Sequence, residues 1–182
     1  MSSNKTLKTI QTLCKIGKIL SKIAFVCSIV GTVGCAVGIA ALSLGLTENI
    51  TVGNLTIHSI IEKNAEMSVG TMYADMIVGG ILCLGEVFLS RISANYFSHE
   101  LKAGTPFTMA GAREMMRLGI CTICIPVGTM IAADIAYETI NHTFAAVADM
   151  HIDHYASVGL GVMFIVMSLL CKLGAQQSAE EK

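Results

Sequence analysis

The sequence contains few charged residues. Of its 182 residues, 14% are charged, whereas a soluble domain usually carries about 25%. The deficit is uneven, because long stretches carry no charge at all and the Lys and Arg residues lie in clusters between them. Together with a hydrophobic fraction of 53%, this distribution is typical of a membrane protein and argues against a soluble one.

The motifs of the common enzyme classes are also missing. The sequence contains no nucleophile elbow, phosphate-binding loop, dinucleotide-binding fingerprint or kinase motif. It also contains no basic stripe with interleaved aromatic residues, which is typical of a nucleic-acid-binding surface. We therefore expect a protein that is not an enzyme, holds no cofactor and does not bind nucleic acid directly.

Four long apolar segments are present instead, at residues 23–46, 69–89, 118–136 and 155–171. A helix needs about 20 mostly apolar residues to cross a membrane, and backbone groups in hydrocarbon must be paired within their own segment. The first segment is longer than the core of a signal peptide, which favours a retained span. The sequence thus predicts an all-α integral membrane four-helix bundle that forms a single domain of residues 1–182.

The basic residues predict the orientation of this bundle. Eleven of the twelve lie before the first span, between the second and third, or after the fourth, and only Lys63 lies on the other side. Because loops rich in Lys and Arg stay in the cytoplasm, we expect both termini and an amphipathic loop of residues 90–117 to be cytoplasmic in a multi-pass protein of the cell membrane. Residues 47–68 and 137–154 would form the outer loops. None of the seven cysteines lies in these outer loops, which excludes an outer disulfide framework.

Three acidic residues lie inside the apolar segments. Asp75 and Glu86 are eleven positions apart, which places them on nearly the same helix face, and we expect Asp134 at about the depth of Asp75. Acids within a membrane are costly and usually face the bundle interior or a water-filled cavity. A cation or proton site at Asp75 and Asp134 would indicate a small oligomeric transporter or channel. Alternatively, each acid reaches the membrane interface or a nearby basic residue.

Glycines suggest close contacts between helices. The candidates for helix packing are Gly31, Gly34 and Gly38 in the first span and Gly79 in the second. Gly34 and Gly38 form a GxxxG pair, a spacing that lets two helix backbones approach closely. The contacts could join two copies in a homo-oligomer or pack the helices of one chain, and the sequence leaves both alternatives open.

The last outer loop contains potential metal ligands, namely His142, Asp149, His151 and His154. Imidazole and carboxylate groups bind first-row metals. Their spacing matches no defined metal motif, so a solvated acidic loop is the alternative to a metal site.

Residues 90–117 are the most distinctive part of the sequence. Gly104 and Pro106 predict a turn, and Thr108 predicts the N-cap of a helix that continues into the third span. The candidate contact residues of this segment are Arg91, Lys102, Phe107, Arg113 and Arg117. We interpret the segment either as an amphipathic connector or as a docking surface for a cytoplasmic partner or anionic lipid.

The same segment resembles a family of small bacterial membrane proteins catalogued as domain of unknown function 2975. The resemblance rests on Tyr96-Phe97, Lys102, Gly104-Thr-Pro-Phe107 and Met116-Arg-Leu-Gly-Ile120. Members are similar in length and in having four spans. The family has no established activity, but its members are often accompanied by a small helix-turn-helix regulator. The resemblance therefore implies the membrane component of a regulatory or stress-response pair, which binds its partner through the cytoplasmic loop.

Overall fold

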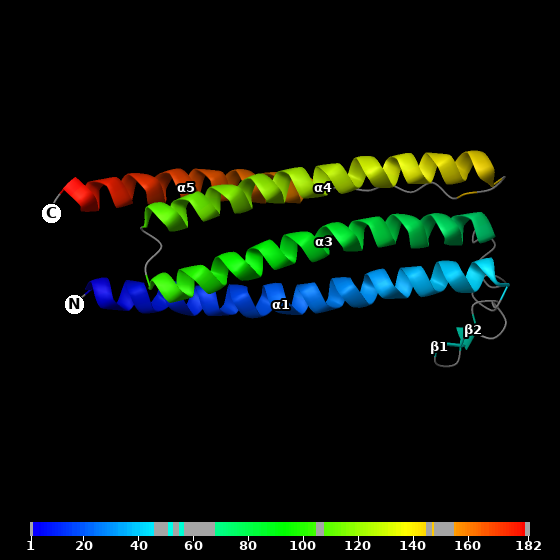
Figure 1. Cartoon of the computed structure of the whole chain (residues 1–182), viewed down its shortest axis with the longest axis horizontal. Helices are drawn as coiled ribbons and strands as arrows, with labels where there is room; N and C mark the ends of the chain where they lie inside the picture. Colours follow the sequence, from blue (N-terminus) through cyan, green and yellow to red (C-terminus); the bar gives the residue numbers. More distant parts are fainter. Residues whose placement is uncertain are drawn as a thin grey trace. The chain divides into compact units, whose positions relative to one another are not determined.

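Four long helices and one very short β-ribbon make up the computed structural model of the chain (Figure 1). It describes residues 2–45, 51–52, 55–56, 68–104, 108–144, 147 and 155–180. The helices are α1 (Ser2–Ser43), α3 (Val69–Ala103), α4 (Met109–Thr143) and α5 (Tyr155–Glu180). Strands β1 (Thr51–Val52) and β2 (Leu55–Thr56) pair antiparallel. Apart from this ribbon, the predicted all-helical fold is confirmed.

All four helices are long and apolar enough to cross a membrane. The apolar segments 69–89, 118–136 and 155–171 lie inside α3, α4 and α5, and the first segment extends past the end of α1 to a residue outside those described. A helix of 35 residues, such as α3 or α4, is about 52 Å long, whereas the hydrocarbon core of a bilayer is about 30 Å thick. The helices α1, α3 and α4 therefore continue well beyond their apolar segments.

The connection between α3 and α4 has the expected break. Gly104 has a φ of +75°, a left-handed conformation that glycine adopts at no steric cost, and its N–H donates to the Glu100 carbonyl at 3.1 Å. Thr108 caps α4, since its hydroxyl accepts a hydrogen bond from the Gly111 N–H at 2.9 Å. The turn and the N-cap predicted from the sequence are thus confirmed. Residues 90–103 and 109–117 are helical, so the segment expected as a loop is mostly a pair of helix ends.

The chain forms two compact units. The first consists of Met1–Cys27, Glu86–Val127 and His154–Lys182, and the second of Ser28–Gly85 and Gly128–Asp153. The first unit carries eleven basic and five acidic residues, a formal charge of +6, and the second carries one basic and eight acidic residues, a formal charge of −7. These charges add to the −1 of the whole chain. Positive charge is therefore concentrated in the unit that contains both termini and the α3–α4 connection.

In the first unit, α4 and α5 approach each other at the backbone. A Cβ added to Gly119 would lie 3.0 Å from the carbonyl oxygen of Gly161, and one added to Gly161 would lie 2.9 Å from the carbonyl oxygen of Gly119. Leu118, which is 1% exposed, fills the core next to this contact. Helix α1 also packs closely, since a Cβ on Gly17 would lie 2.7 Å from the Phe97 ring of α3. Only residues without a side chain permit these approaches.

In the second unit, the predicted packing glycines lie between α1 and α3. A Cβ on Gly31 would meet the Cys83 sulfur at 2.9 Å, and one on Gly38 would meet the Met76 sulfur at 2.9 Å. One on Gly79 would lie 3.6 Å from the Cys35 sulfur. Gly34 differs, because a Cβ there would meet no described atom within 4 Å. Three of the four glycines thus pack helices of one chain, while Gly34 is exposed.

This difference gives a first prediction. We expect Gly31→Leu to lower the free energy of unfolding in detergent by about 1–3 kcal/mol, because the new side chain has to displace Cys83. Gly34→Leu is the matched control, and we expect little change or a slight gain there from higher helix propensity. Both variants are compared by SDS-induced unfolding, with their oligomeric state followed by light scattering. Dissociation of an oligomer by Gly34→Leu would instead assign that glycine to a contact between copies.

Candidate functional site

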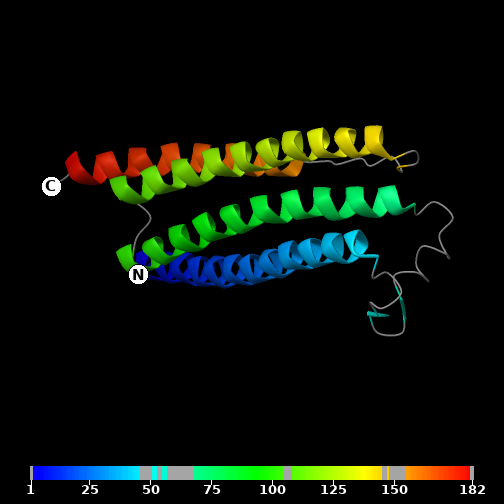
Figure 2. The ribbon, with the colours of Figure 1, turned by 45° about the vertical axis from the view of Figure 1, so that its right-hand side comes forward.

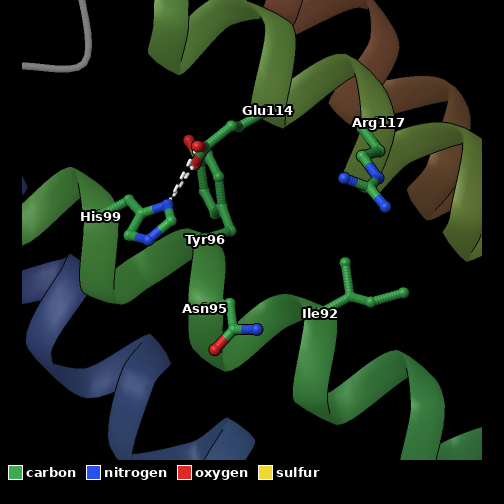
Figure 3. A pocket seen from close by; sticks show the side chains of 6 residues that line it. All are labelled: Ile92, Asn95, Tyr96, His99, Glu114 and Arg117. Atoms are coloured by element: carbon green, nitrogen blue, oxygen red, sulfur yellow. Dashed lines mark hydrogen bonds and ion pairs between the residues drawn. The ribbon is translucent and has the colours of Figure 1, made fainter.

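A pocket opens between the end of α3 and the start of α4 in the first unit, with a volume of about 190 Å³ (Figure 3). It is lined by Ile92, Asn95, Tyr96 and His99 of α3 and by Glu114 and Arg117 of α4. Helices α3 and α4 form a helical hairpin, and this arrangement explains why these residues meet. His99 and Glu114 are nearly equidistant in sequence from the break at residues 104–108, so two antiparallel helices bring them together.

His99 and Glu114 join the two helices across the pocket. The Nδ1 of His99 lies 2.9 Å from Oε1 and 3.0 Å from Oε2 of Glu114. The two side chains are 60% and 40% exposed, and a pair this open to solvent contributes at most about 1 kcal/mol to stability. Its main effect is therefore to fix the position of both side chains at the mouth of the pocket.

Arg117 offers the pocket a free positive charge. It is exposed, and within the described part of the chain it forms no ion pair. In Figure 3 its guanidinium lies apart from the His99–Glu114 pair. Because a guanidinium forms paired hydrogen bonds with carboxylates, the pocket is suited to an acidic group presented by another molecule.

A buried carboxyl group lies next to the pocket. Glu100 is 5% exposed and follows Tyr96 by one helical turn on the buried face of α3, where Tyr96 is 6% exposed. Its Oε2 has no hydrogen-bond partner among the described residues. The groups close enough to interact with it electrostatically include Cys14 of α1, Cys171 of α5 and Glu114 of α4. All four helices thus contribute to the surroundings of this one acid.

An unpaired buried carboxyl group weakens a fold. Leaving a buried polar group without a partner costs about 1–3 kcal/mol, and more if it is charged. In native proteins such a group is uncommon and is usually explained by local strain, by a functional role, or by a bound water or ion. A metal site does not provide the explanation here, since no three His, Cys, Asp or Glu residues among those described are arranged to hold an ion.

Comparisons with known proteins do not identify the site. No family model, curated protein or solved structure matches this chain. The role of the site is therefore inferred from its own residues.

Helix α1 is held against the α3 side of this site by two polar contacts. The Lys18 ammonium donates to the Ser98 hydroxyl at 3.1 Å, and the Gln11 side chain donates to the Gly104 carbonyl at 3.4 Å. Lys18 belongs to the basic leader, the group of lysines that precedes the first apolar segment 23–46. Part of that leader therefore packs against α3.

The predicted intramembrane acids are not gathered at either described pocket. Asp75 is half-buried on α3, and Glu86 of α3 and Asp134 of α4 are exposed. Asp75 and Asp134 also lie at different levels within the second unit. A Cβ on Gly85 of α3 would contact Thr129 of α4, and the rings of Tyr73 and Phe144 stack at 5.5 Å, so Asp134 lies beside a residue about five positions from Asp75, or about 8 Å along the helix. The expected common depth in the membrane stays a prediction, because the level of two residues along packed helices does not fix their depth in a bilayer.

The predicted contact residues of the 90–117 segment divide into three groups. Arg91 and Lys102 are exposed on α3 and line neither described pocket. Arg117 lines the pocket in Figure 3, and Arg113 lines a second one between α4 and α5. Phe107 lies outside the described residues.

Only one of the four predicted metal ligands lies among the described residues. His142 is exposed near the end of α4, and its Nε2 lies 3.3 Å from Oε1 of Glu138, one helical turn earlier. Asp149, His151 and His154 lie outside the described residues. The proposed metal site therefore stays a prediction.

Three residues at the site, His99, Glu100 and Glu114, were not identified as candidates from the sequence, and Tyr96 was identified only through the family resemblance. The symmetric placement of His99 and Glu114 about the predicted turn was an available signal. The one-turn spacing of Tyr96 and Glu100 was another signal, since it places an acidic residue on the same helix face as an aromatic residue. The contact of Gly119 with α5 had no such signal, because it depends on how two distant segments pack.

Proposed function

We propose that this chain is a small non-enzymatic protein that crosses the cell membrane four times, with both termini in the cytoplasm. Four helices of sufficient length and apolarity support the four spans. The separation of charge supports the orientation, because the unit with both termini carries eleven of the twelve basic residues. In this orientation the α3–α4 hairpin projects into the cytoplasm.

We further propose that the hairpin binds a cytoplasmic regulator protein. The observation that carries this proposal is the pocket between α3 and α4, with Arg117 at its edge and in no ion pair with a described residue. A connector between two spans needs only a few residues. Here α3 continues from Leu89 to Ala103, which adds about 21 Å of ordered helix beyond the apolar segment. An acidic and partly apolar surface of a partner would fit, with its carboxylate at Arg117 and its apolar side chain against Ile92 and Tyr96.

The resemblance to the small bacterial membrane proteins agrees with this proposal. Of the residues that carry the resemblance, Tyr96 lines the pocket. The accompanying helix-turn-helix regulators of that family would be natural partners. The alternative of a carboxylate-dependent transporter has less support, because neither described pocket is lined by Asp75, Glu86 or Asp134.

Site-directed crosslinking tests the proposal. A photoreactive amino acid replaces Asn95, which is exposed and lines the pocket, and in a control chain it replaces Glu138, which is exposed in the second unit. In native membranes we expect a discrete crosslinked product from position 95 and none from position 138. The product is identified by mass spectrometry as a soluble protein.

Charge variants of the same chain make the test specific. Arg117→Glu should abolish the product because it places a negative charge where the partner's carboxylate binds, whereas Arg91→Glu should leave it intact. Retention of the product in Arg117→Glu, or the same product from positions 95 and 138, would contradict binding at this pocket.

A further inference from the structure

A second pocket lies between the start of α4 and the end of α5 in the first unit, with a volume of about 220 Å³. It is lined by Met109, Ala112, Arg113 and Met116 of α4 and by Ser168 and Lys172 of α5. The Ser168 hydroxyl donates to the Ala112 carbonyl at 2.6 Å and is buried. This hydrogen bond holds the two helices together beside the pocket, so its walls are fixed.

Two positive charges face this pocket from different helices. Arg113 and Lys172 are both exposed, and neither forms an ion pair with a described side chain. Helix α4 begins at Met109, so the positive end of its dipole lies at the same place. Two cations that share a pocket without a counter-charge repel each other, and a single anion between them would satisfy both.

An apolar stripe continues from this pocket along α4. It consists of Met109, Met116 and Ile120, which lie on one face of α4 at helical spacing. Arg113 lies on the same face, between Met109 and Met116. Met109 and Ile120 are each 48% exposed, and Ile120 already lies within the apolar segment 118–136. On α5, Lys172 comes directly after the apolar segment 155–171. The pocket is therefore placed where an apolar surface ends and positive charge begins.

We propose that this pocket binds an anionic phospholipid, with its phosphate between Arg113 and Lys172 and an acyl chain along Met116 and Ile120. The inference rests on the membrane location proposed above but not on partner binding, which involves other residues. Basic pockets between helices on the cytoplasmic side are suited to anionic headgroups. The apolar stripe distinguishes a lipid from a free phosphate ion, because only a lipid would bury it.

Lipid titration of the purified full-length chain tests this site. The chain in mild detergent is titrated with phosphatidylglycerol, phosphatidylcholine or inorganic phosphate, and bound molecules are counted by native mass spectrometry. We expect one tightly bound phosphatidylglycerol. Its apparent affinity should fall about fivefold in Arg113→Gln or Lys172→Gln and about thirtyfold in the double variant. The matched control is the double variant Arg91→Gln/Lys102→Gln, which removes two exposed cations that line neither pocket.

The control determines the interpretation. Retained affinity in Arg91→Gln/Lys102→Gln, with little binding of phosphatidylcholine or phosphate, supports the proposed site. Equal losses in the two double variants would show only diffuse attraction to positive charge and would overturn it. Equal binding of phosphatidylcholine, or binding of inorganic phosphate as tight as that of the lipid, would also overturn it. Circular dichroism of each variant confirms that the helices are retained.

Discussion

Gly161→Leu is expected to detach α5 from α4. A Cβ at this position would meet Ile123 and the carbonyl oxygen of Gly119, and a backbone atom cannot move aside as a flexible side chain can. Overpacking of a well-packed interior costs about 1–3 kcal/mol, and we expect the upper end of that range or more here. The free energy of unfolding is measured by SDS titration in mixed micelles. Peptide-resolved labelling of the Cys171 thiol, which is 5% exposed, should also become faster as α5 separates.

Gly159→Leu is the matched control for this prediction. Gly159 lies two residues earlier on the same helix, and a Cβ there would meet no described atom within 4 Å. We expect no loss of stability and no faster labelling of Cys171. Equal losses in both variants would mean that leucine itself, rather than the contact with Gly119, disturbs α5.

Glu100→Met is expected to stabilise the chain. The substitution replaces a buried carboxyl group, whose Oε2 has no partner among the described residues, with an apolar side chain of similar length. Removal of a buried polar group that lacks a partner recovers a desolvation cost of about 1–3 kcal/mol. We expect a higher midpoint of thermal unfolding in detergent. Glu114→Met is the control, since Glu114 is 40% exposed and paired with His99, and its loss should change stability by less than about 1 kcal/mol.

A lower midpoint in Glu100→Met would contradict this prediction. It would show that the carboxyl group makes a stabilising interaction that outweighs the cost of its burial. If the substitution stabilises the chain and also removes the crosslink at position 95, Glu100 is retained for binding at the expense of stability.

Sequence patterns predicted the helices of this protein well, because each helix is specified by residues within its own segment. Each apolar segment is long enough to identify a helix on its own, and Gly104 and Thr108 mark the break between two of them. The contacts between helices were harder to predict. The pairing of Gly119 with Gly161 and the burial of Glu100 depend on the register of segments far apart in the sequence. The level of Asp134 along α3 depends on this register too, since equal distance from a span end does not give equal height in the fold.

The candidate site was predictable only in part. Arg113 and Arg117 were identified as contact residues, because basic side chains in an amphipathic segment favour an interface. Their assignment to two different pockets required the structure, which pairs Arg113 with Lys172 of α5. No local pattern connects these two residues, because they lie 59 positions apart in the sequence, on different helices.

The unequal lengths of the helices affect which membranes suit the chain (Figure 2). The apolar segment of α5, residues 155–171, covers 17 residues, which is about 25 Å as a helix. The other apolar segments, residues 23–46, 69–89 and 118–136, cover 24, 21 and 19 residues, and a segment that is longer than the bilayer is thick can tilt to fit. The apolar segment of α5 has no such extra length. In a thicker bilayer, hydrophobic mismatch would therefore draw Lys172 toward the hydrocarbon. In a membrane, the shortest apolar segment would therefore favour thinner bilayers.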